Sequence, residues 1–184
     1  MYKFLIIIIF PLFVFAKSAV LSNILDGDSA VFKDGDKNII CHLGDLDALE
    51  MRINKKLEEE MKKCSFSKEN FITAGQESFN HAQKLLKIGA TYEYTVTRVL
   101  PNKNLVCSLK IPKGLHVEIH PYFDQLMVSD GFALPYVIYS SKEDKNTLLK
   151  IAKGAKVQEK GLWKTHPDLM QCLVEHRYSL RSLR

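Results

Sequence analysis

The sequence lacks several features that would place it at once in a familiar class of protein. It has four cysteines but no Cys-x-x-Cys pair, which argues against a zinc ribbon or a thioredoxin-type redox centre. Its formal charge of +5 is not gathered into the basic stripe of a dedicated nucleic-acid binder. What is present is an ordinary balance, 46% hydrophobic and 26% charged among 184 residues, which predicts one globular domain.

The N-terminus also lacks an apolar run long enough to cross a membrane, because Phe4 to Phe15 falls short of the roughly 20 residues of a spanning helix. The basic Lys3 precedes this run, and Val14-Phe15-Ala16 fits the rule for signal-peptide cleavage. This order predicts a signal peptide over residues 1–16 and an exported protein, periplasmic or secreted, that begins at Lys17. After cleavage no stable membrane insertion is expected. The alternative is an uncleaved membrane anchor.

Two short segments concentrate carboxylates, Asp26-Gly27-Asp28-Ser29 and Asp47-Ala48-Leu49-Glu50. Three carboxylates that lie close together suit an oxygen-preferring cation and an activated water. The alternative is that the Asp-Gly sequences only form turns.

The residues between these segments, 30–43, predict a β-hairpin with a short loop at Asp34-Gly35-Asp36. If Lys33 faces Lys37 across that loop, Asp28 faces His42. Facing side chains share one side of a sheet, so this register would bring Asp28 and His42 together.

The rest of the chain predicts more strands and several helices. Alternating, β-branched patterns indicate strands at 91–99, 104–111 and 115–119, and apolar spacing indicates helices at 78–86, 122–130 and 148–158. Five short strands with about three packed helices predict an α+β fold, a five-stranded OB-type β-barrel.

Two basic segments do not belong to this pattern. Residues 51–72 are interpreted as a helical insertion, in which Lys55-Lys56 and Lys62-Lys63 flank Glu58-Glu59-Glu60. That order is typical of a solvated helix with i,i+4 ion pairs, and a nucleic-acid-binding patch is the alternative. Residues 165–184 are a C-terminal extension, interpreted as a frayed basic terminus.

From about Asp26 to Trp163 the sequence resembles the staphylococcal nuclease, or thermonuclease-like, family. Four segments carry the resemblance by their order and spacing. Residues 41–50 resemble the family's strand ending I-R-L-x-x-[IV]-D-[AT]-P-E, and residues 75–86 resemble its helix opening G-x-E-A. Residues 129–133 resemble its A-G-[FL]-A, and residues 155–163 its A-x-x-x-x-x-G-L-W ending. The resemblance implies the same OB-type barrel over residues 17–164.

In that family the aspartates matching Asp28 and Asp47 hold calcium, and the glutamate matching Glu50 acts on the attacking water. Two arginines bind and polarise the scissile phosphate. Their positions here hold His42 and Asn104, with Lys103 available if the alignment shifts by one residue. The resemblance therefore implies Ca²⁺ as cofactor and nucleic acid as partner, in a centre that lacks both arginines.

Four cysteines in an exported chain permit two disulfides in any of three connectivities. Cys41 lies on the hairpin and Cys107 on a later barrel strand, whereas Cys64 lies in the insertion and Cys172 in the extension. We favour the pairs Cys41–Cys107 and Cys64–Cys172. Four buried free thiols are the alternative.

Two hypotheses follow for the function. The first is an exported, monomeric, calcium-dependent phosphodiesterase that acts on DNA or RNA, with activity weak or lost. Each missing arginine removes a preorganised phosphate contact worth about 10²–10³ in rate, which neither His42 nor Asn104 reproduces. The second is a non-enzymatic OB-fold binding or scaffold protein of the cell envelope.

Overall fold

The computed structural model describes residues 17–112 and 120–183. The predicted signal peptide, residues 1–16, and the predicted strand at 115–119 lie outside the described residues.

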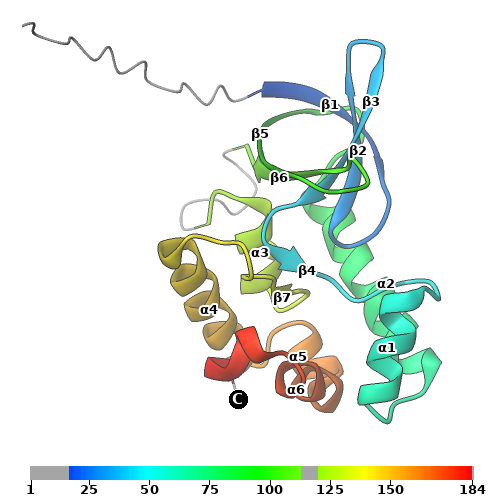
Figure 1. The fold of residues 1–184 in the computed structure, drawn as a ribbon, viewed down its shortest axis with the longest axis vertical. Helices are drawn as coiled ribbons and strands as arrows, with labels where there is room; N and C mark the ends of the chain where they lie inside the picture. The colour runs from blue at the N-terminus through cyan, green and yellow to red at the C-terminus, as the bar shows by residue number, and fades with distance from the viewer. Residues whose placement is uncertain (1–16, 113–119, 184) are drawn as a thin grey trace, which may run out of the picture.

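Five strands close into a barrel in the order β1-β2-β3-β6-β5 (Figure 1). Neighbours pair antiparallel, except that β3 and β6 run parallel. The closed, mixed barrel confirms the predicted α+β fold with an OB-type barrel. The strands are β1 (Lys17–Ile24), β2 (Ser29–Asp34), β3 (Lys37–Leu43), β5 (Thr91–Val99) and β6 (Leu105–Lys110).

The first of these strands, β1, is absent from the strands that the sequence patterns indicated. It alternates buried and exposed residues, with Ala19, Leu21 and Ile24 facing the core. Inside the barrel Phe32 and Tyr94 stack with ring centroids 6.0 Å apart. The barrel is therefore filled by side chains and is not a channel.

The predicted register of the β2–β3 hairpin is wrong by one residue. Asp34 pairs with Lys37, and Lys33 pairs with Asn38. The connection is a two-residue turn, because Gly35 adopts φ +61°, a conformation that glycine reaches without a steric penalty. As a result Ser29, and not Asp28, lies opposite His42.

Below the barrel lie the helices, with the C-terminal helices farthest from the strands (Figure 1). The described residues form six α-helices and one 3₁₀-helix. They are α1 (Lys55–Lys63), α2 (Lys68–Leu85), α3 (Phe123–Ser129), α4 (Lys142–Val157), α5 (Leu162–Thr165), α6 (Pro167–Glu175) and η1 (Tyr178–Leu183).

Two helices begin earlier than the apolar spacing predicted. Helix α2 starts after Ser67, whose side chain accepts a hydrogen bond from Asn70 N, and so it includes the end of the interpreted insertion. Helix α4 starts after Ser141, which caps Asp144 N in the same way. The serine cap of α4 stabilises a polar first turn that carries no apolar stripe, which explains why the stripe alone places that start too late. Helix α2 already buries Phe71 and Ala74 ahead of the predicted start.

Two disulfides, Cys41–Cys107 and Cys64–Cys172, link the chain as the favoured pairing predicted. The first joins β3 to β6 inside the barrel. The second joins the end of α1 to α6, across 108 positions of sequence. The insertion and the C-terminal extension are therefore tied to each other covalently.

The C-terminal extension is packed, which corrects its interpretation as a frayed terminus. Helix α6 buries Leu169, Met170, Leu173 and Val174, and the 3₁₀-helix buries Leu180 and Leu183. These apolar side chains join the common core, so the extension is part of the domain.

Candidate functional site

The three predicted carboxylates lie on two segments at the base of the barrel. Asp28 precedes β2, Asp47 belongs to the short strand β4 (Leu46–Asp47), and Glu50 follows it. Asp28 Oδ2 accepts a hydrogen bond of 2.9 Å from the backbone N–H of Ala48, which joins the two segments. Strand β4 is itself held by pairing with β7 (Leu134–Pro135).

A glycine in α2 lets the Glu50 segment approach the helix closely. A Cβ atom at Gly75 would lie 2.3 Å from the backbone oxygen of Glu50, far inside contact distance. Only glycine allows this approach without displacement of the backbone. Gly75, quoted above for its resemblance to the family's helix opening, thereby has a physical role in placing Glu50.

Lys56, in the first turn of α1, inserts its ammonium group among these carboxylates. Its Nζ atom forms a short ion pair with Asp47 Oδ1 and lies 2.9 Å from Glu50 Oε1. It also donates to the backbone oxygen of Ala48 at 3.0 Å. The interpretation of this lysine as part of a solvated helix face is therefore wrong.

Arg177, just after α6, reaches the same cluster from the other end of the chain. Its guanidinium lies 2.7 Å from Asp47 Oδ2 and 2.6 Å from Glu60 Oε1. Asp47 is thus paired through both carboxylate oxygens, with Lys56 on one and Arg177 on the other. Only 15% of the Asp47 side chain is exposed.

The pKa values in the cluster follow from burial and from these charges. Burial opposes ionisation of Asp47, but Arg177 and Lys56 lower its pKa below the ordinary value. Burial likewise opposes the charged form of Lys56, whereas Asp47 and Asp28 raise its pKa above the ordinary value. Burial raises the pKa of Asp28 to about 7, against the attraction of Lys56.

As they lie, these residues do not fit a calcium ion. Asp47 Oδ1 and Glu50 Oε1 both contact the ammonium group of Lys56. Both oxygens of Asp47 are already paired with a cation, Lys56 or Arg177. Among the described residues, one group brings at least three histidine, cysteine or carboxylate ligand atoms within 4.8 Å of one another. It consists of Cys64, Cys172 and His176. Two of these three are joined in a disulfide.

The two positions that the resemblance matches to the family's arginines, His42 and Asn104, lie close together, on β3 and just before β6. His42 pairs with Val106, and Asn104 lies just before Leu105, which pairs with Cys41. Ser29 Oγ lies 3.0 Å from His42 Nδ1 and 3.0 Å from Asp28 Oδ1, so it bridges the histidine to the carboxylate. Lys103 is exposed in the β5–β6 turn, with φ +67°.

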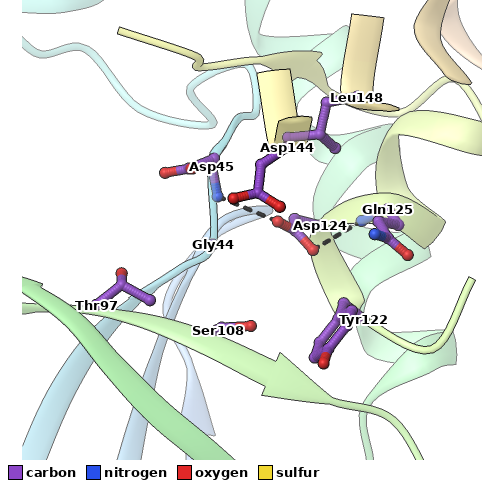
Figure 2. A pocket seen from close by; sticks show the side chains of 9 residues that line it. All are labelled: Gly44, Asp45, Thr97, Ser108, Tyr122, Asp124, Gln125, Asp144 and Leu148. Carbon is purple, nitrogen blue, oxygen red and sulfur yellow. Dashed lines mark hydrogen bonds between the residues drawn. The ribbon is translucent and has the colours of Figure 1, made fainter. Parts of the chain in front are cut away.

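Three further aspartates, Asp45, Asp124 and Asp144, line a cavity of about 220 Å³ beside the barrel; the Asp45 carboxylate points away from the other two (Figure 2). Asp124 accepts backbone hydrogen bonds from Asp45 at 3.3 Å and Gln125 at 2.9 Å. Asp45 and Asp144 each accept a hydrogen bond of 2.6 Å from a serine, Ser140 and Ser141. These carboxylates have partners within the fold, and we assign them a structural role.

Sequence reasoning located the carboxylates and missed both cations. One signal for the cations was available, because the favoured Cys64–Cys172 pairing already required the insertion and the extension to meet. The lysine-rich and arginine-rich segments that flank these cysteines were then candidates to face the carboxylates.

A closed five-stranded barrel with helices and clustered carboxylates at its base is the architecture of a nuclease-like OB fold. A family model described as staphylococcal nuclease homologue matches residues 42–165. This chain belongs to that family, which is generally calcium-dependent. A search of curated proteins finds no match. Within the described residues, no helix is both long and apolar enough to cross a membrane.

Proposed function

We propose that this protein is an exported, thermonuclease-like nucleic-acid-binding protein whose phosphodiester hydrolysis is weak or absent. The observation that carries the proposal is that both carboxylate oxygens of Glu50 accept hydrogen bonds from neighbouring side chains. Its Oε1 accepts from Lys56 at 2.9 Å and its Oε2 accepts from Asn54 Nδ2 at 2.7 Å. A carboxylate with both oxygens engaged is poorly placed to hold and activate a water molecule.

The phosphate-binding half of the centre supports the same conclusion. His42 and Asn104 stand where the family places its arginines, and neither offers a bidentate contact to phosphate. Loss of one preorganised donor typically costs about 10²–10³ in rate. With two such losses and Glu50 occupied, the expected activity is far below that of a working nuclease.

Support for binding comes from an exposed aromatic surface beside β4. Tyr136 and Tyr139 are 37% and 65% exposed, and Tyr136 N donates to the backbone oxygen of Asp45 at 2.8 Å. The guanidinium of Arg98 lies 4.4 Å from the Tyr139 ring centroid. Aromatic rings and arginine together provide stacking platforms for single-stranded bases.

Export is part of the proposal, and two disulfides are compatible with it, because disulfides persist in oxidising compartments. The calcium role of Asp28 and Asp47 and the catalytic roles of Glu50, His42 and Asn104 remain predictions from the resemblance. The pairing of Asp47 and Glu50 with Lys56 weighs against those roles.

A labelled single-stranded oligonucleotide tests both halves of the proposal. In millimolar calcium, purified protein should leave the oligonucleotide intact, whereas in EDTA fluorescence anisotropy should report binding. Tyr139→Ala should weaken binding by about 1–3 kcal/mol. Tyr122→Ala, a change at a tyrosine that is 38% exposed outside this surface, serves as the control for loss of an aromatic ring. Efficient calcium-dependent cleavage contradicts the loss of hydrolysis, and binding unaffected by Tyr139→Ala contradicts the assigned surface.

A further inference from the structure

The ammonium group of Lys56 has the surroundings of a bound metal ion. Its contacts are one oxygen of Asp47, one oxygen of Glu50 and the backbone oxygen of Ala48. Carboxylate and carbonyl oxygens are the ligands that hard divalent cations take in proteins. The protein therefore supplies, from its own helix α1, the positive charge that would otherwise come from solution.

Arg177 supplies the second charge that this cluster needs. A single ammonium carries half the charge of a calcium ion, and the guanidinium of Arg177 lies on the remaining oxygen of Asp47 at 2.7 Å. The two side chains are only 33% and 21% exposed, so solvent screens their pairs incompletely. Together they carry the same charge as one divalent cation.

The fold holds the two cations in place with a covalent link. Lys56 lies in α1, which ends at Cys64, and Cys64 is bonded to Cys172 in α6. Arg177 follows α6 directly and also pairs with Glu60 of α1 at 2.6 Å. The disulfide therefore restrains the backbone positions from which both cations reach the carboxylates.

We propose that Lys56 is a resident counter-ion that replaces a divalent cation in this chain, so that its fold is independent of calcium. Replacement of Lys56 by a neutral side chain should then convert the site into one that binds calcium. The inference concerns the carboxylates alone, and it holds whether or not the protein binds or cleaves nucleic acid.

Thermal unfolding and calorimetric titration with calcium chloride test this inference, on the oxidised protein at constant ionic strength. The wild type should show the same melting temperature in EDTA and in millimolar calcium. Lys56→Met should melt lower than the wild type in EDTA and recover in calcium, with calcium affinity at least about tenfold above the wild type. A ligand that binds only the native state raises its stability in this way.

Lys55→Met is the matched control, because Lys55 is the preceding residue of the same helix and is exposed. It removes the same net charge and should leave both the melting temperature in EDTA and the calcium response close to wild type. Lys56→Met combined with Asp47→Asn should fold in EDTA and lose the calcium response.

Several outcomes would overturn the inference. The first is a wild-type protein whose melting temperature rises in millimolar calcium, a measurement that needs no variant to fold. The second is a Lys56→Met variant that stays unfolded with and without calcium, since calcium would then fail to replace the ammonium. The third is a calcium response that persists after Asp47→Asn, which would place the ion elsewhere.

Discussion

Removal of the guanidinium at position 177 is the most direct test of how the carboxylate cluster is stabilised. In Arg177→Met the apolar part of the side chain is largely kept, while Asp47 and Glu60 each lose a partner at 2.7 and 2.6 Å. Glu60 Oε2 already has no hydrogen-bond partner among the described residues. The variant therefore removes the ion-pair partner of Glu60 and leaves Asp47 with Lys56 alone, so that two poorly solvated carboxylates lose compensating charge.

The expected cost follows from burial of the three side chains. Breaking a fully buried ion pair by removal of one partner costs about 3–5 kcal/mol. Because 21% of the arginine side chain is exposed, solvent partly screens the charges that remain, and we expect about 2–3 kcal/mol. For a domain of this size that corresponds to a fall of about 4–12 °C in melting temperature.

Urea denaturation of Arg177→Met and Arg52→Met in EDTA provides the measurement. Arg52 is an exposed arginine in the segment after Glu50, so its loss controls for net charge and should change stability by less than about 0.5 kcal/mol. Glu60→Gln added to Arg177→Met should restore part of the lost stability. That recovery would appear as a coupling of about 1 kcal/mol or more in the double-mutant cycle.

The reasoning is refuted if Arg177→Met and Arg52→Met lose the same small amount of stability. The C-terminal segment would then behave as the frayed terminus that its composition suggests. Strict additivity between positions 177 and 60 would also count against the contact, because residues in one ion-pair network are expected to be coupled.

Four further predictions use other parts of the structure. Replacement of Cys64 and Cys172 by alanine should cost up to about 4–5 kcal/mol in urea denaturation, because the bond closes a loop of 108 positions; four thiols that react with an alkylating agent under denaturing, non-reducing conditions would contradict both disulfides. His42→Arg with Asn104→Arg should raise calcium-dependent cleavage of an oligonucleotide only when Lys56→Met is also present, and Glu50→Gln should then remove the gain, because the residues act as one constellation. Burial raises the pKa of Asp124 above its ordinary value, so its stabilising contribution is complete below pH 3.8 and is lost as the pH rises through the raised pKa; Asp124→Asn should flatten that part of the stability curve, and an unchanged slope would argue against it. Intact mass of the exported protein should correspond to a chain that begins at Lys17, whereas a full-length mass in the membrane fraction would favour an anchor.

Local patterns in the sequence were sufficient for most of the barrel. Alternation of buried and exposed side chains is a property of neighbouring residues, and it located β2, β3, β5 and β6. The register of the β2–β3 hairpin was not local in this sense. Asp34-Gly35-Asp36 suits a two-residue or a three-residue turn, and only the paired strands select between them.

The carboxylate cluster could also be predicted from the sequence. Asp28 precedes the hairpin and Asp47 and Glu50 follow it, so this spacing places the three side chains near one another in any fold of this type. Their partners could not be predicted in this way. Lys56 lies in Lys-Lys-Leu-Glu-Glu-Glu, which has the composition of a solvated helix, and its inward direction depends on how α1 packs against the Glu50 segment.

The sequence by itself determined most of the barrel strands and the negative half of the site, and it favoured the cysteine pairs that the structure has. The tertiary structure decided the positive half. Arg177 reaches Asp47 only after α6 has docked and joined α1 through Cys172, and no local pattern encodes that approach. Long-range charge pairing depends on the final distance between side chains, and folding alone sets that distance.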